Sequence, residues 1–205
     1  TTLFRSIDRD ALNKAFIGGK GETIHNLYFH QTRPGWNPDW PTKFKDAYGY
    51  DPAAAKRLLA EAGYPNGLSL KMGVSNSDIA ANLLAYQGFA ADLAKIGVRV
   101  EILLQPPTRL QLDQFNGRLE VDMFNTFARG TDPIIDYRHR SCLGGTGRAP
   151  YHCDPDIVAV VKAAVAEQNL EKRAALYRQV ARMELQSPPG LTMWQGLEFD
   201  GLGPR

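Results

Sequence analysis

The 205-residue sequence lacks the features that mark membrane proteins and nucleic-acid binders. No apolar run approaches the roughly 20 residues that a membrane span needs. The formal net charge is only +2, so nucleic acid and anionic membranes are not expected as partners. No charged segment followed by an apolar one opens the chain, and we expect a cytosolic protein, a processed protein or a fragment. With 43% hydrophobic and 22% charged residues, the composition is that of a globular domain.

The motifs of common enzymes are also missing. There is no GxSxG, HExxH or CxxC sequence, and the four histidines are scattered. The glycine-rich run at 144–147 does not predict a phosphate cradle, because no strand leads into it and no Lys-Ser/Thr pair follows. Catalysis needs a positioned base, acid or metal. We therefore expect no enzyme, no cofactor and no metal.

The only two cysteines, Cys142 and Cys153, are separated by ten residues that include three glycines and a proline. Such a loop can fold back on itself, and a disulfide across it would stabilise the fold by roughly 2–3 kcal/mol. A disulfide would place the protein in an oxidising compartment. The alternatives are two free thiols, or a partial metal site with His139 or His152.

Helical and strand patterns alternate along the chain, which predicts an α/β fold. In 51–63, Asp51 is expected to cap a helix, Pro52 suits its first turn and Gly63 ends it. Residues 20–50 are expected to be an irregular, packed connection whose tryptophans lie in the core or contact a ligand. The pattern predicts a largely parallel sheet covered on both faces. The expected helices are 4–17, 52–62, 78–96, 108–115, 155–168 and 170–186, and the expected strands are 68–74, 98–104, 121–128 and 191–194.

Several of these segments resemble one known family. DPAAAKRLLAEAGYPNG at 51–67 resembles the pattern yDp.kAk.LLaeAGyp.G of the family 5 extracellular solute-binding proteins, the peptide/nickel type. SIDRDALNKAFIGGKG at 6–21, GFAADLAKIGVRVEI at 88–102 and the stretch 151–191 are similar to further family segments in the same order. The cysteine pattern also resembles a short disulfide loop of bacterial dipeptide-binding proteins.

The resemblance implies a type II, cluster C periplasmic binding protein-like lobe with a mainly parallel sheet flanked by helices. It further implies that 1–205 is a single C-terminal lobe, with a helix and connection in 1–50, an α/β core in 51–195 and a tail in 196–205. The N-terminal lobe would be absent. A start inside a family helix indicates truncation, and a naturally short relative is the alternative.

The function that the resemblance implies is solute capture for an ABC importer. A peptide-like, opine-like or sugar-like solute would be held between two lobes and delivered to permease subunits. The protein would be a monomer without direct membrane insertion, periplasmic or extracellular, with a lipid anchor as an option for the full-length form. The alternative is a ligand-sensing or interaction module of the same fold.

The ligand is expected outside the C-terminal ends of the strands. Relatives that bind peptides often show W.aDy.dP where this chain has FARGTDP, which puts Arg129 in place of an acidic residue. A guanidinium suits a carboxylate or phosphate, so an anionic or sugar-like ligand is predicted. Alternatively, Arg129 pairs with Asp132 or Asp136, Asp132 forms a turn before Pro133, and Trp194 packs in the core. The expected ligand-binding residues are Asn76, Phe127, Arg129, Thr131, Asp132 and Trp194.

Overall fold

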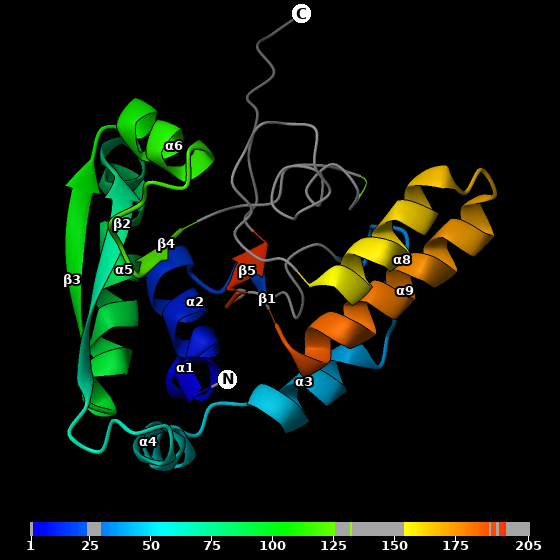
Figure 1. Cartoon of the computed structure of the whole chain (residues 1–205). Coiled ribbons are helices and arrows are strands. Elements are labelled where there is room, and N and C mark those ends of the chain that lie inside the picture. The colour runs from blue at the N-terminus through cyan, green and yellow to red at the C-terminus, as the bar shows by residue number, and fades with distance from the viewer. Residues whose placement is uncertain are drawn as a thin grey trace, which may run out of the picture.

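The computed structural model describes residues 2–23, 30–125, 132, 154–188, 190, 191 and 193–195. No helix in these ranges is long and apolar enough to cross a membrane. The elements are α1 (Thr2–Ser6), α2 (Arg9–Ile17), β1 (Glu22–Thr23), α3 (Trp40–Tyr48), α4 (Pro52–Glu61), β2 (Leu68–Ser75), α5 (Asn76–Lys95), β3 (Val98–Gln105), α6 (Pro107–Phe115), β4 (Met123–Phe124), α8 (Pro155–Ala166), α9 (Leu170–Gln186) and β5 (Trp194–Gln195) (Figure 1).

A three-stranded parallel sheet organises one half of the molecule. Its strand order is β3-β2-β4, and β2 pairs with β3 from Leu68 opposite Val98 to Ser75 opposite Gln105. Helix α5 makes the crossover between these two strands, as parallel neighbours require. A separate two-stranded sheet joins β1 and β5 antiparallel. The predicted parallel α/β arrangement is therefore confirmed for β2, β3 and β4. The strand expected over 191–194 is instead β5, Trp194–Gln195, which pairs antiparallel outside this sheet.

Helices cover one face of the parallel sheet more completely than the other. Leu68, Leu70 and Val98 belong to a core with buried residues of α2, α4 and α5, which we call the α/β core. Because successive side chains of a strand point to opposite faces, every second residue of β2 and β3 faces away from this core. The exposed residues of that face include Ser69, Lys71, Arg99 and Glu101. Helix α6 covers only the far end, where Leu110 approaches Gly73. Within the described residues, helices therefore lie along one face of the sheet and α6 lies at the end of the other.

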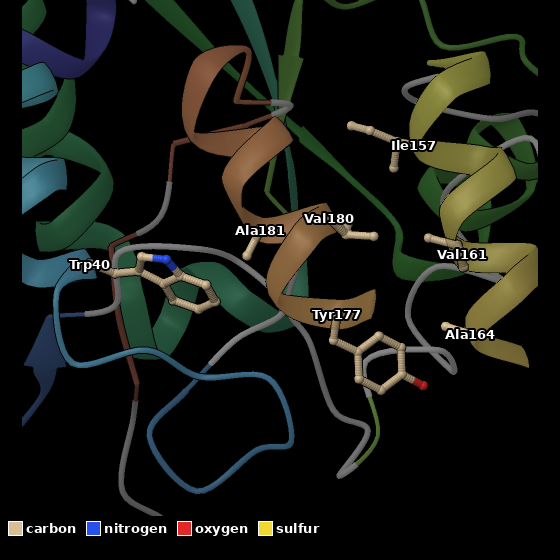
Figure 2. Close-up of a cluster of buried hydrophobic side chains, with 7 residues drawn as sticks. All are labelled: Trp40, Ile157, Val161, Ala164, Tyr177, Val180 and Ala181. Atoms are coloured by element: carbon tan, nitrogen blue, oxygen red, sulfur yellow. The ribbon is translucent and has the colours of Figure 1, made fainter. Parts of the chain in front are cut away.

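Helices α3, α8 and α9 pack together into a second core, and in Figure 1 α1 and α2 lie between these helices and the parallel sheet. We call these three helices the helical unit. Figure 2 shows side chains of α8 and α9 pointing into this core, with Trp40 of α3 at its side. The buried members are Trp40, Ile157, Val161, Ala164, Tyr177, Val180 and Ala181.

A third, smaller cluster joins these two regions. Phe4 of α1 packs with Phe44 and Tyr48 of α3, and Leu185 of α9 lies against them. The Tyr48 hydroxyl donates to the Leu185 carbonyl at 2.5 Å. Arg5 donates to the Ala47 carbonyl at 2.7 Å, so polar contacts reinforce the apolar ones. We refer to this cluster as the seam.

Two of the helical predictions need correction. The helix expected over 4–17 is two helices, because Asp8 caps α2 by accepting from Ala11 N–H while its own N–H donates to Asp92. The irregular connection expected over 20–50 contains α3, whose aromatic residues Trp40, Phe44 and Tyr48 are all buried on one side. Spacing by four residues was the available signal for that helix.

Other elements agree with the prediction closely. Helix α9 spans Leu170–Gln186, as expected from its apolar pattern. The predicted caps are present, since Asp51 accepts from Ala54 N–H and Asp154 from Asp156 and Ile157 N–H. Helix α5 begins two residues before the expected start because Ser75 caps it. Of the strand expected over 121–128, the structure describes Met123–Phe124 as β4, and 126–128 lie outside the described residues.

Candidate functional site

Two of the predicted ligand segments, those that follow β2 and β3, begin at one edge of the parallel sheet. Strands β2 and β3 end side by side, at Ser75 and Gln105. Strand β4 runs parallel to them with Phe124 opposite Gly73, so the chain beyond β4 leaves from the same edge. We call this the carboxyl edge. Parallel α/β sheets hold their ligands at this kind of edge.

Asn76 is exposed at the carboxyl edge as the first residue of α5. Its neighbour Ser75 is buried, with 5% of its surface exposed, and Ser75 Oγ accepts from Ser77 N–H at 3.2 Å. The Ser75 and Ser77 hydroxyls are 2.8 Å apart. The serines thus serve the helix cap, while the amide of Asn76 remains directed to the surface.

Gln105 ends β3 with a polar atom that the described residues do not satisfy. Its Oε1 is buried and has no hydrogen-bond partner among the described side chains and backbone. An acceptor left in that state costs about 1–3 kcal/mol. The carboxyl edge therefore retains a buried acceptor beside Ser75.

Asp132 is held by two residues of α9. The Tyr177 hydroxyl donates to Asp132 Oδ1 at 2.6 Å, and Arg173 Nη1 lies 3.7 Å from Oδ2. Burial raises the pKa of Tyr177 well above its ordinary value, and its hydrogen bond to Asp132 adds to the effect. The phenol consequently stays a donor throughout the physiological pH range.

Trp194 lies on β5 opposite Thr23 of β1. Its side chain is partly buried and packs on the α/β core. A Cβ placed on Gly21 would lie 3.1 Å from Trp194 Cβ and Cδ1, so Gly21 permits this close packing. This placement is the core-packing alternative considered from the sequence, and Trp194 remains partly exposed as a residue.

The remaining predicted site residues lie outside the described part of the chain. They are Phe127, Arg129 and Thr131 of the ligand segment and the two cysteines, Cys142 and Cys153. His139 and His152, the candidate metal ligands, lie there as well. Among the residues that are described, no group of three or more His, Cys, Asp or Glu is close enough to hold a metal ion.

Sequence patterns did not reveal the roles of Tyr177 and Arg173. The two residues are four apart on α9, so they share a helix face. Nothing in the local sequence connects that face with Asp132, which is 45 residues from Tyr177. Trp36 and Trp40 pack with the helical unit, and Trp40 is only 4% exposed, so packing is the interpretation that holds for Trp40.

Comparison with known families identifies the class of protein. Residues 3–142 match the family described as bacterial extracellular solute-binding proteins, family 5 Middle. This match extends over more than half of the chain. The chain belongs to this family, whose members bind solutes for transport and are not enzymes.

Curated relatives match nearly the whole chain at modest identity. Heme-binding protein A of Haemophilus influenzae is 27% identical, over 98% of this chain and 36% of that protein. A putative ABC transporter peptide-binding protein of Brucella ovis is 28% identical, over 94% of this chain and 37% of that protein. The dipeptide-binding protein of Escherichia coli is 26% identical, with 97% and 37% covered. The chain thus spans little more than a third of the length of these relatives.

Solved structures show the same fold. The periplasmic binding protein DppA of Helicobacter pylori, in complex with the peptide STSA, superposes with a TM-score of 0.79 at 23% identity, over 94% of this chain and 37% of that one. AgaA of A. tumefaciens R10, in complex with agropinic acid, gives a TM-score of 0.75 at 21% identity, over 95% and 39%. The chain therefore has the fold of part of a periplasmic binding protein.

Proposed function

We propose that this chain is one lobe of the substrate-binding component of an ABC importer. The observation that carries the proposal is the family match over residues 3–142. The fold shared with DppA over 94% of this chain supports it. The importer's permease subunits would be the protein partners, and the compartment would be the periplasm or the outer surface of the cell.

The lobe would act as one jaw of a hinged clamp. In such proteins two domains close around a ligand, and the hinge absorbs the motion. Residues 1–205 would form the C-terminal lobe, and the other jaw would come from sequence outside this chain. The whole would be a monomer, attached to the membrane, if at all, through a lipid. A Cys142–Cys153 disulfide is proposed for the same oxidising compartment.

The carboxyl edge is the proposed ligand surface of this jaw. Asn76 is exposed there, and Phe127, Arg129 and Thr131 follow β4 in the sequence. Trp194 is retained as a candidate because it is only partly buried. A guanidinium at position 129 favours a carboxylate, a phosphate or a sugar over the ammonium group of a peptide. Peptide-like, opine-like and sugar-like solutes are the candidates, with an anionic group expected near Arg129.

Calorimetry on the full-length protein tests this proposal. The probes are dialanine, N-acetyl-dialanine and agropinic acid. We expect N-acetyl-dialanine, which keeps the carboxylate but has no ammonium group, to bind more tightly than dialanine, and agropinic acid tests the opine-like alternative. Arg129→Ala should weaken the binding of N-acetyl-dialanine at least tenfold, which is the effect of losing about 1.4 kcal/mol. Arg99→Ala, on the exposed opposite face of the sheet, is the matched control and should leave the affinity unchanged.

Two results would count against the proposal. Tight dialanine binding that Arg129→Ala leaves unchanged would remove the anionic preference. Micromolar or tighter binding by residues 1–205 alone would contradict the idea of a half-clamp, because each jaw should supply only part of the contacts.

A further inference from the structure

Asp132 belongs to the predicted ligand segment, yet its carboxylate already engages the helical unit. One oxygen accepts a hydrogen bond from Tyr177 at 2.6 Å, and the other lies 3.7 Å from Arg173. The residue that follows the sheet edge is thus tied to a helix that is distant in sequence. Both carboxylate oxygens of Asp132 thus already have a neighbour on α9 that a ligand ammonium would have to compete with.

The two partners of Asp132 are themselves fixed in place. Tyr177 is fully buried, and Figure 2 shows its ring between α9 and α8. Arg173 donates from Nε and Nη2 to the carbonyl of Glu167, at 3.0 and 2.7 Å, which orients its guanidinium. A donor whose position is set by other contacts loses little entropy when it binds.

The contact is also of a strong kind. A hydrogen bond to an ionised carboxylate is shorter and about twice as strong as one between neutral groups. The side chains of Asp132 and Arg173 are only 30% and 23% exposed, so water competes weakly for them. Burial keeps Tyr177 protonated and therefore able to donate.

We infer that Tyr177 and Arg173 are positioning residues for ligand binding, and that Asp132 is their anchor point on the ligand segment and does not itself contact the solute. Through these contacts α9 would fix the position of Asp132. The inference rests on the proposed function, because it assigns a role within the proposed ligand surface.

Tyr177→Phe in the full-length protein removes only the donating hydroxyl and keeps the buried ring. The matched control is Val180→Ala, which takes methyl groups from the same fully buried core but alters no group that could bond to a carboxylate. A third variant, Asp132→Ala, removes the anchor point. All three are compared at temperatures well below their unfolding midpoints.

Hydrogen exchange of peptides covering 126–133, followed by mass spectrometry, needs no ligand. We expect Tyr177→Phe and Asp132→Ala to speed this exchange about tenfold, the effect of losing one hydrogen bond to a charged group. Val180→Ala should leave it at the wild-type rate. In calorimetry with dialanine and agropinic acid, the first two variants should weaken whichever probe the wild type binds by the same factor, and Val180→Ala should not.

Three outcomes would overturn the inference. Unchanged exchange in Tyr177→Phe would remove the anchor, and faster exchange with full affinity would remove the positioning role. Loss of binding in Asp132→Ala alone would make Asp132 a ligand contact. If the wild type bound neither probe, the proposed function would fail, while the exchange rates would still decide whether the anchor exists.

Discussion

The two halves of the molecule are built from different sequence relationships. In the α/β half, β2, α5 and β3 follow one another within residues 68–105. The two strands pair with each other, and α5 connects them. The helical unit combines α3, at 40–48, with α8 and α9, at 155–186. Strands β2 and β3 thus find their hydrogen-bonding partners close by in the sequence. The aromatic side of α3, in contrast, is buried by helices that come more than 100 residues later.

The seam decides whether these halves behave as one body. Phe44 is 2% exposed, its ring stacks beneath the Arg9 guanidinium at 4.3 Å, and it lies 5.2 Å from the Tyr48 ring centroid. Side chains of α1, α3 and α9 therefore share one small core. We expect cooperative unfolding as long as this core is intact.

The largest expected effect comes from emptying the seam. Phe44→Ala should cost about 3–5 kcal/mol, as for other fully buried aromatic residues, and should separate the unfolding of the two halves. In a Trp194→Phe background, fluorescence reports the helical unit through Trp36 and Trp40, while circular dichroism reports the whole chain. The two thermal transitions should then occur at different temperatures.

The exposed Leu112, at 52%, provides the control for that experiment. Leu112→Ala should keep the wild-type midpoint and coincident transitions. If the fluorescence and circular dichroism transitions of Phe44→Ala also coincide, then the seam is not what couples the two halves. The α/β half and the helical unit would then unfold together without it.

A smaller effect is expected at the start of the parallel ladder. Gly67 has φ +80°, and a Cβ there would overlap the carbonyl oxygen of Gly97. Gly63 has φ +95° with open space around it. Gly67→Ala should destabilise by about 2–4 kcal/mol, since strain and overlap add, and Gly63→Ala by only about 1–2 kcal/mol.

Urea unfolding of the two glycine variants measures that difference directly. Both variants should affect the α/β half first. Equal losses at the two positions would show that backbone strain alone matters and that the strands can move apart to admit a methyl group.

The smallest effect concerns pH and the helical unit. The pKa of Tyr177 is raised in the folded state, above the value of 10.0 for a free tyrosine. Below pH 10 the phenol is protonated whether the chain is folded or unfolded, so it adds no pH dependence. Above pH 10 the unfolded chain releases this proton and the folded chain keeps it, so stability falls as pH rises.

Between pH 10 and 11.5 the free energy of unfolding should therefore fall less steeply with pH in Tyr177→Phe than in the wild type. The difference in slope should correspond to at most one proton, and urea unfolding at several pH values measures it. Val180→Ala is again the control and should keep the wild-type slope. An unchanged slope in Tyr177→Phe would mean that the hydroxyl ionises as freely in the folded state as in the unfolded state.

The sequence predicted correctly those helices whose ends are set by residues next to them in the chain. Asp51 and Asp154 cap their helices as expected, and α9 has the predicted length. The break at Asp8 was missed because the carboxylate of Asp92 that receives its N–H is 84 residues away. The sequence pattern does not predict helix α3, because the partners of its aromatic side lie in α1, α8 and α9, far away in the sequence.

The candidate site divides in the same way. The shared carboxyl edge of β2, β3 and β4 follows from their parallel direction, which the alternating pattern predicted. The fastening of Asp132 to α9 does not, because it depends on how two distant segments meet. In the proposed two-lobed protein, the identity of the solute would depend on both lobes, and this chain would hold only part of that information.

The bond from Tyr48 to the Leu185 carbonyl joins residues 137 positions apart. During synthesis, α3 leaves the ribosome long before α8 and α9 can cover its aromatic side. The β2–α5–β3 unit can form first, while Trp40, Phe44 and Tyr48 remain exposed to solvent. Contacts of such long sequence separation slow folding, so this aromatic side is the surface that a chaperone would be expected to shield in the newly made chain.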